Sequence, residues 1–89
     1  YGNHLKEPYL KYELLYVARR YAADDNPEYA EAIFELLTIL MPDYPNGWFY
    51  YAEFLARNGE RERAADCYKK TVQLNPDGAI AKRRLEELE

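Results

Sequence analysis

Few residues in this sequence are of the types that carry out chemistry. The chain has one histidine, His4, one cysteine, Cys67, and no serine. A nucleophile needs a neighbouring base, and a zinc site needs several imidazole or thiolate ligands. His4 and Cys67 meet neither condition, and there is no glycine-rich phosphate-binding loop. We interpret Cys67, beside the apolar Tyr68, as a small packing residue rather than a redox-sensitive or metal-binding thiol, and we expect no catalytic residue, no metal site and no cofactor.

Two acidic groups are the remaining candidates for chemistry. Residues 24–26 are Asp-Asp-Asn, but this run lacks the ligand spacing and the closing glutamate of an EF-hand calcium loop. Glu60, Glu62 and Asp66 are close enough in sequence to share one surface. Carboxylates on a helix this rich in charge are usually solvated. The first group is therefore better explained as a helix stop followed by a cap, and the second as a solvated surface.

Length and charge narrow the class of protein further. The 89 residues predict a single domain over residues 1–89, which would bury only about 60–65% of its unfolded surface and so has little room for a deep catalytic cavity. A net charge of -4 argues against nucleic acid as a partner, with residues 82–84 as the one basic cluster. No apolar run of about 18 residues and no signal-peptide pattern is present. We expect no membrane partner and a cytoplasmic location.

Apolar residues recur at three- and four-residue spacing in five stretches, which predicts an all-α fold. The predicted helices cover residues 9–23, 27–40, 46–57, 61–74 and 79–89. Asn26 before Pro27 predicts a helix start, and Gly59 after Asn58 predicts a left-handed stop. Such short helices are marginal alone, and their short connections force neighbours to pack antiparallel. We therefore expect an α-solenoid of about five helices arranged as hairpins.

The chain repeats itself with a period of 34 residues and no insertion. Identical residues recur one period apart, among them Tyr16 and Tyr50, Ala18 and Ala52, Ala30 and Ala64, Leu40 and Leu74, Pro42 and Pro76, and Asp43 and Asp77. Chemically similar residues fill many of the remaining positions, such as Phe34 and Tyr68. A fixed period of paired helices is typical of repeat proteins, in which each unit packs on its neighbour.

This pattern resembles the tetratricopeptide repeat family, whose unit is a pair of helices of this length. Residues 45–78 match the family pattern at Trp48, Tyr51, Ala52, Leu55, Gly59, Ala64, Tyr68 and Pro76. Residues 11–44 match it at Leu14, Val17, Ala18, Tyr21, Ala30, Phe34, Leu37 and Pro42, with Asp25 in place of the turn glycine. The resemblance implies a right-handed superhelix of two full repeats, 11–44 and 45–78, with 1–8 as a lead-in and 79–89 as a capping helix.

Small and large residues stand at the positions where close helix packing needs them. The small ones, which let helix axes approach, are Ala18, Ala30, Ala52 and Ala64, and the large ones, which fill the volume between helices, are Trp48, Phe34 and Tyr68. Lys82 stands where Trp48 would recur. This exchange predicts that the last helix is solvated on its outer side and covers the final apolar face.

The resemblance also implies where a partner binds. In tetratricopeptide arrays, the first helix of each pair faces a concave groove. Carried over by register, the groove residues are Tyr12, Leu15, Tyr16 and Arg19 from the first pair, Asn46, Phe49, Tyr50, Glu53 and Arg57 from the second, and Arg83 and Arg84, with Ile80 and Glu87, from the last helix. An aromatic groove edged by arginines suits an extended or helical peptide with acidic residues. The alternative is that these aromatic residues only pack within and between the helix pairs.

Two classes of function follow from this fold. The leading one is a protein–protein interaction module that binds a peptide or partner helix in its concave groove. The alternative is a structural accessory domain of a larger protein, which docks in cis or self-associates through exposed aromatics near its start, Tyr1, Tyr9 and Tyr12. We expect a protein or peptide partner and a monomer or weak homodimer. Leu15 and Arg19 replace the Lys and Asn with which some family members clamp acidic chaperone tails, so this sequence departs from that pattern.

Overall fold

The computed structural model describes residues 10–88, and five helices account for its architecture. They are α1 (Leu10–Ala23), α2 (Pro27–Leu40), α3 (Pro45–Arg57), α4 (Arg61–Leu74) and α5 (Ala79–Leu88). The predicted all-α fold is confirmed, and the predicted bounds that fall on described residues agree within one residue. Pro45 rather than Asn46 takes the first turn of α3. The predicted outer ends of the first and last helices, residues 9 and 89, lie outside the described residues.

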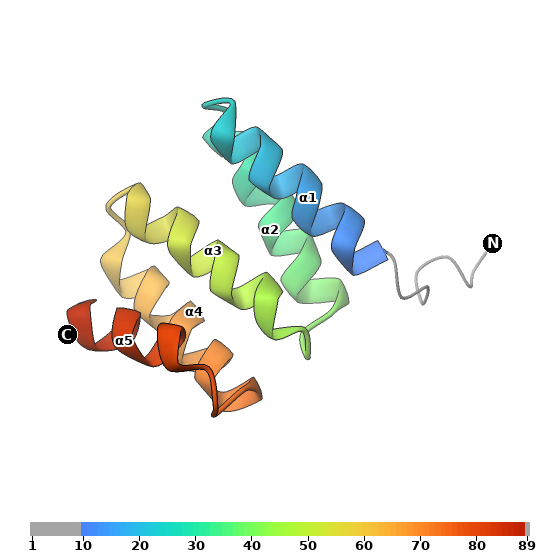
Figure 1. Ribbon diagram of the computed structural model, residues 1–89. Coiled ribbons are helices and arrows are strands. Elements are labelled where there is room, and N and C mark those ends of the chain that lie inside the picture. The colour runs from blue at the N-terminus through green and yellow to red at the C-terminus, as the bar shows by residue number, and fades with distance from the viewer. Residues whose placement is uncertain (1–9, 89) are drawn as a thin grey trace.

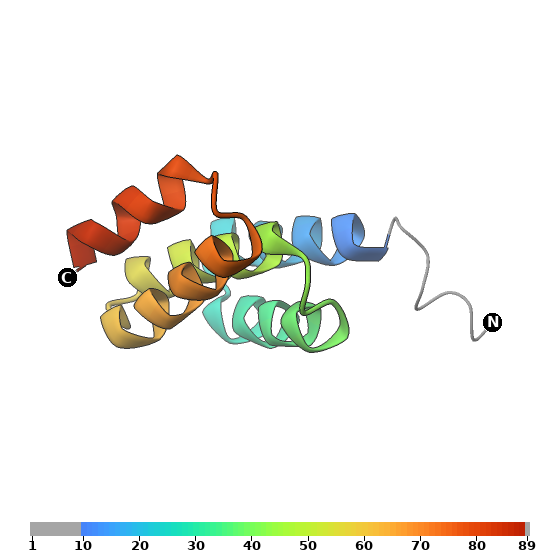
Figure 2. The same ribbon diagram turned by 90° about the horizontal axis from the view of Figure 1, so that it is seen from below.

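Each helix packs against the next in chain order, and α1 also contacts α3. Figure 1 shows the α1/α2 pair at one end of the molecule and α5 at the other. Seen from below in Figure 2, α1 and α3 lie in one layer and α2 and α4 in the other, with α5 on the side of α1 and α3. The result is a tetratricopeptide-like solenoid in which α1, α3 and α5 share one side of the molecule.

The core lies where the two layers meet. All four alanines predicted to allow close approach are fully buried: Ala18, Ala30, Ala52 and Ala64. Phe34 of α2, which is 1% exposed, stacks on Tyr51 with ring centroids 5.5 Å apart and contacts Phe54 at the same distance. Both of its aromatic neighbours belong to α3. Phe34 therefore joins the first helix pair to the second.

Three predicted packing positions are less buried than expected. Trp48 is only partly buried, and its Nε1 donates a hydrogen bond to the carbonyl oxygen of Pro42 (2.9 Å) in the loop that precedes α3. On α1, Val17 and Tyr21 each remain 36% exposed, whereas Leu15 is buried. One period later, the equivalents of Val17 and Tyr21 are covered by α2. Within residues 10–88, no helix covers α1 and α2 in the same way.

The turns within the two helix pairs have the same geometry. The amide of Asn26 donates to the carbonyl of Tyr21 (2.9 Å), and 34 residues later Glu60 donates to Leu55 (2.9 Å). Both bonds span five residues, as in a Schellman motif, which needs a left-handed residue just before the donor. Gly59 supplies it with φ 83°, as predicted, and Asp25 adopts φ 62°. Asn26 takes the predicted N-cap position, but its side chain makes no capping hydrogen bond.

The left-handed Asp25 leads to the first prediction. An L-residue in this region is strained, because its Cβ approaches the backbone carbonyl, and glycine lacks that atom. We expect Asp25→Gly to raise the free energy of unfolding by about 0.5–1 kcal/mol, since the relief of strain exceeds the added freedom of the unfolded chain. Urea unfolding followed by circular dichroism measures this change. The reverse exchange, Gly59→Asp, should destabilise the equivalent turn; equal effects of the two variants would contradict the argument.

Candidate protein-binding surface

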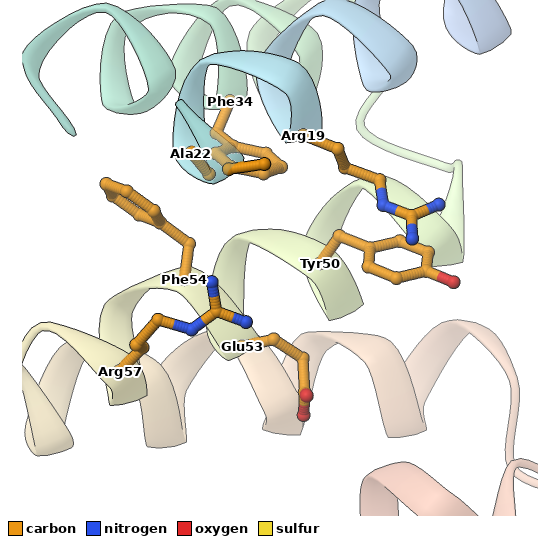
Figure 3. Close-up of a pocket in the computed structure, with 8 residues that line it drawn as sticks. Arg19, Ala22, Phe34, Tyr50, Glu53, Phe54 and Arg57 are labelled. Atoms are coloured by element: carbon orange, nitrogen blue, oxygen red, sulfur yellow. The ribbon is translucent and has the colours of Figure 1, made fainter. Parts of the chain in front are cut away.

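A cleft of about 320 Å³ lies between α1 and α3. Arg19 enters it from α1, and Tyr50, Glu53 and Arg57 enter it from successive turns of α3. Figure 3 shows the Arg19 guanidinium against the Tyr50 ring, with Arg57 reaching into the space between the helices. The centre of the guanidinium is 4.3 Å from the ring centroid, which is within the range of a cation–π interaction. The cleft thus presents two arginines beside an aromatic ring.

The carboxylate of Glu53 in this cleft is already engaged. It accepts a hydrogen bond from the hydroxyl of Tyr68 and one from Nε of Arg84 (3.0 Å). Burial raises the pKa of Tyr68, and its hydrogen bond to Glu53 raises it further. The same carboxylate raises the pKa of Arg84 through its hydrogen bond. Because Glu53 is held by α4 and α5, the charges left facing the cleft are those of Arg19 and Arg57.

A second cleft of about 280 Å³ lies between α3 and α5. Asn46, Phe49 and Tyr50 line it from α3, and Ile80, which is 62% exposed, lines it from α5. The rings of Phe49 and Tyr50 meet edge to face, with centroids 5.2 Å apart. Tyr50 belongs to both clefts. The two clefts therefore form neighbouring parts of one surface along α1, α3 and α5.

Comparison with known families bears on the α3/α4 pair, whose helix α3 forms the middle of this surface. Residues 45–77 match the family model of the tetratricopeptide repeat. The α3/α4 pair is thus a tetratricopeptide repeat. Tetratricopeptide repeats generally mediate protein–protein interactions and are typically non-enzymatic modules. No curated protein matches the chain.

Several residues that the family register assigned to the groove line neither of the two clefts. Leu15 is only 8% exposed and belongs to the hydrophobic core, because it points toward the interior of the helix pairs rather than along the open side of α1. Tyr12 packs edge to face on Tyr44 (6.1 Å) at the start of α3. Tyr16, 63% exposed, lines a hollow with Arg19, Arg20 and Ala23, and Arg19 and Ala23 also line the cleft between α1 and α3. The expectation that Leu15 is open to a partner is therefore wrong.

The arginines of α5 also differ from one another. Arg83 is exposed and lines neither of the two clefts. Arg84 forms an ion pair with Glu53 (3.0 Å), which links α5 to α3, and a second with Glu87 of α5 itself (3.9 Å). The structure thus brings together seven of the predicted groove residues: Arg19, Asn46, Phe49, Tyr50, Glu53, Arg57 and Ile80.

The sequence interpretation missed part of the cleft lining. Phe54, 8% exposed, and the core residue Phe34 line the cleft between α1 and α3, together with Ala22 and Ala23. Phe54 follows Tyr50 by four residues and precedes Arg57 by three, so all three share one side of α3. That spacing is the signal that could have found it. It is an aromatic where the first helix pair has Arg20, and so it has no counterpart in the repeat comparison.

The described residues show little that points to other chemistry. Over residues 10–88, no group of three or more His, Cys, Asp or Glu side chains is placed to hold a metal ion. Burial raises the pKa of the Cys67 thiol to about 11, which keeps it protonated at neutral pH. None of the described helices combines the length and the apolar character that a membrane crossing requires.

Proposed function

We propose that this domain binds a segment of a partner protein along the surface formed by α1, α3 and α5. The observation that carries the proposal is the pair of clefts that meet at Tyr50. Aromatic side chains in a partly open cleft contribute contact area with little loss of conformational freedom, which makes them effective anchors. An extended chain or a short helix that crosses α3 would contact both clefts at once.

The charges of the surface indicate the chemistry of the partner. Arg19 and Arg57 form no ion pair with other described residues, while the nearby Glu53 is occupied by Arg84. A carboxylate of the partner would lie between two cations without displacing an internal ion pair. Charge-assisted hydrogen bonds from arginine to carboxylate are among the stronger polar contacts. We therefore propose a peptide with an acidic residue next to an apolar or aromatic one.

The repeat organisation that supports this surface is part of the same proposal. Residues 45–78 form one repeat, residues 11–44 a preceding repeat of the same kind, and residues 79–89 a capping helix. The recurrence of equivalent turn hydrogen bonds one period apart supports this division. So does the packing of α5, where Ala81 is 3% exposed and Leu85 and Leu88 contact the core.

Peptide selection followed by a variant tests the proposal. Peptides from a displayed random library are selected against the folded domain, and the enriched motif is synthesised and titrated by isothermal calorimetry. We expect the Phe49→Ala/Tyr50→Ala variant to bind the motif at least about tenfold more weakly, because both rings line the clefts. We expect Arg57→Ala to weaken only those peptides that carry an acidic residue.

The matched control is Tyr29→Ala, which removes an exposed aromatic ring on α2, away from both clefts. Circular dichroism verifies that each variant is folded. Equal loss of binding in the control and in Phe49→Ala/Tyr50→Ala would place the peptide elsewhere on the domain. Failure to enrich any motif on a folded domain would remove support for peptide binding by this surface.

A further inference from the structure

The cleft between α1 and α3 carries positive charge that no described side chain neutralises. Arg19 and Arg57 line the cleft, and Arg20 lines the adjoining hollow. The side chains of these three exposed arginines form no ion pair and no hydrogen bond with another described residue. The acidic residue in the described lining, Glu53, is held by Arg84. A chain with a net charge of -4 thus has a local site that attracts anions.

Comparison of the two helix junctions shows that the fold itself does not require this charge. One period after Arg19 stands Glu53, and one period after Tyr50 stands Arg84. Where α3 meets α5, these two residues form an ion pair (3.0 Å). Where α1 meets α3, the equivalent residues are Arg19 and Tyr50, which contact each other at 4.3 Å. The same two positions therefore hold a neutralised pair at one junction and an unpaired cation at the other.

The contact with Tyr50 positions Arg19 without using its hydrogen-bond donors. A cation–π interaction engages the positive charge and the face of the ring, and it leaves the N–H groups of the guanidinium available. Those N–H groups form a planar fork that fits the oxygens of a phosphate or carboxylate. Figure 3 shows Arg19 extending from α1 and Arg57 from α3 toward the space between the helices. An anion in that space would accept hydrogen bonds from both helices.

The amount of charge favours a phosphate over a carboxylate. A carboxylate has a single negative charge and balances one arginine. A phosphorylated side chain carries about -1.5 to -2 at pH 7 and presents three acceptor oxygens. Arg19 and Arg57, with Arg20 beside them, supply the two or three positive charges that such a group requires.

The inner lining of the cleft indicates which phosphorylated residue fits. Phe54, 8% exposed, and Phe34, 1% exposed, line it together with the small side chain of Ala22. The volume of about 320 Å³ lies within the range of pockets that take small ligands. An aromatic ring would cover this apolar lining and pack on the phenyl rings, whereas the short side chain of phosphoserine would leave the lining exposed. A ring and a phosphate occur together in phosphotyrosine.

We propose that the cleft between α1 and α3 binds a phosphotyrosine side chain of the partner protein, with the phosphate between Arg19 and Arg57 and the ring against Phe54. This inference rests on the proposed function, because it assigns the acidic and the aromatic feature of the bound segment to one side chain. The neighbouring cleft, lined by Phe49 and Ile80, then receives residues that flank the phosphotyrosine.

Three small probes separate the contributions of the ring and the phosphate. Phenyl phosphate has both, phenylacetate has the ring with a single negative charge, and inorganic phosphate lacks the ring. In NMR titrations at about pH 7.5, we expect phenyl phosphate to bind at least about tenfold more tightly than either of the others, and to shift the side-chain Nε–H signals of Arg19 and Arg57. Equal affinity for phenylacetate would overturn the role of phosphate, and equal affinity for inorganic phosphate would overturn the role of the ring.

Substitutions of single arginines test the location of the site. Arg19→Gln and Arg57→Gln each remove a charge but keep a polar side chain, and each should weaken phenyl phosphate binding at least about tenfold. The matched control is Arg83→Gln, on an exposed arginine that lines neither cleft, and it should leave the affinity unchanged. Circular dichroism verifies folding. An equal loss in Arg83→Gln and Arg57→Gln would mean that the anion does not bind in the cleft.

Peptide libraries distinguish this inference from the proposed function. Three libraries share the same random flanks and carry phosphotyrosine, tyrosine or glutamate at a fixed central position. We expect the phosphotyrosine library to yield a motif that binds at least about tenfold more tightly than its tyrosine and glutamate versions. If the glutamate version bound equally well and lost affinity in Phe49→Ala/Tyr50→Ala, peptide binding would stand and the preference for phosphotyrosine would fail. Enrichment of no motif from any of the libraries would overturn both.

Discussion

Phe34→Ala is expected to lower the free energy of unfolding by about 3–5 kcal/mol. The ring is 1% exposed and contacts Tyr51 and Phe54 of α3, so its removal opens a cavity at the junction of the two helix pairs. The helices around this site are each held by their neighbours and cannot easily collapse into the space. For a domain of this size, whose total stability is about 5–13 kcal/mol, such a loss brings the chain near to unfolding at 37 °C. Urea unfolding followed by circular dichroism measures the change.

Two control variants separate the effect of packing from a general effect of substitution. Phe34→Leu keeps most of the apolar volume and should cost less than about 2 kcal/mol. Ile39 lies on the same helix but is 74% exposed. Ile39→Ala should therefore change the free energy of unfolding by no more than about 0.5 kcal/mol. If Phe34→Ala cost less than about 1 kcal/mol, the junction between the helix pairs would not depend on this ring.

The domain should also lose stability at alkaline pH, through buried groups that must lose a proton. Burial raises the pKa of Tyr51 to about 12 and that of Cys67 to about 11, even though Arg63 lowers both. Burial also raises the pKa of Tyr68. In the unfolded chain these groups titrate near their ordinary pKa values, 10.0 for tyrosine and 9.0 for cysteine. The folded state therefore favours the neutral forms.

The direction of the change in stability with pH, and the pH range in which it occurs, follow from these pKa values. Below pH 9 both states keep their protons, and the full stability is present. As the pH rises from 9 to about 12, the unfolded state releases protons first, and the free energy of unfolding falls. Tyr51 and Cys67 each contribute about 2–3 kcal/mol when their titration is complete. We expect the urea midpoint to be constant from pH 7 to 9 and then to decrease steeply.

Substitutions show which groups cause this loss of stability at alkaline pH. Tyr51→Phe should reduce the loss between pH 10 and 12, because phenylalanine has no proton to release, and Cys67→Ala should reduce the loss between pH 9 and 11. Tyr16→Phe, on a side chain that is 63% exposed, is the matched control and should leave the profile unchanged. A urea midpoint that stayed constant from pH 9 to 11.5 in the parent would refute the role of buried protons.

Much of the fold could be predicted because it depends on neighbours in the sequence. Pro27 and Gly59 mark helix ends through their own backbone restrictions, and the structure has α2 begin and α3 stop where these residues predict. The alanines at the close contacts were identified by the repeat alone. The exposure of Val17 and Tyr21 could not be predicted in this way, because it depends on whether another helix covers that side of α1.

The candidate binding surface, too, could be predicted from the sequence only in part. The period placed Tyr50, Phe49 and Arg57 on the first helix of their pair, and the structure brings them to the clefts. It did not indicate that Glu53 and Arg84 would satisfy each other, since they are 31 residues apart and meet only when α5 folds back on α3. Phe54 was missed because its role depends on the neighbouring α1.

The amino-acid sequence by itself determined the helices, their ends and the period of 34 residues, because periodicity, proline and glycine act over a few residues of chain. Only the tertiary structure decided which side of each helix stays open. Leu15 and Tyr16 are adjacent on α1, yet one is 8% and the other 63% exposed. That difference arises from where the other helices lie against α1, and such contacts join residues too distant in sequence for a local pattern to record.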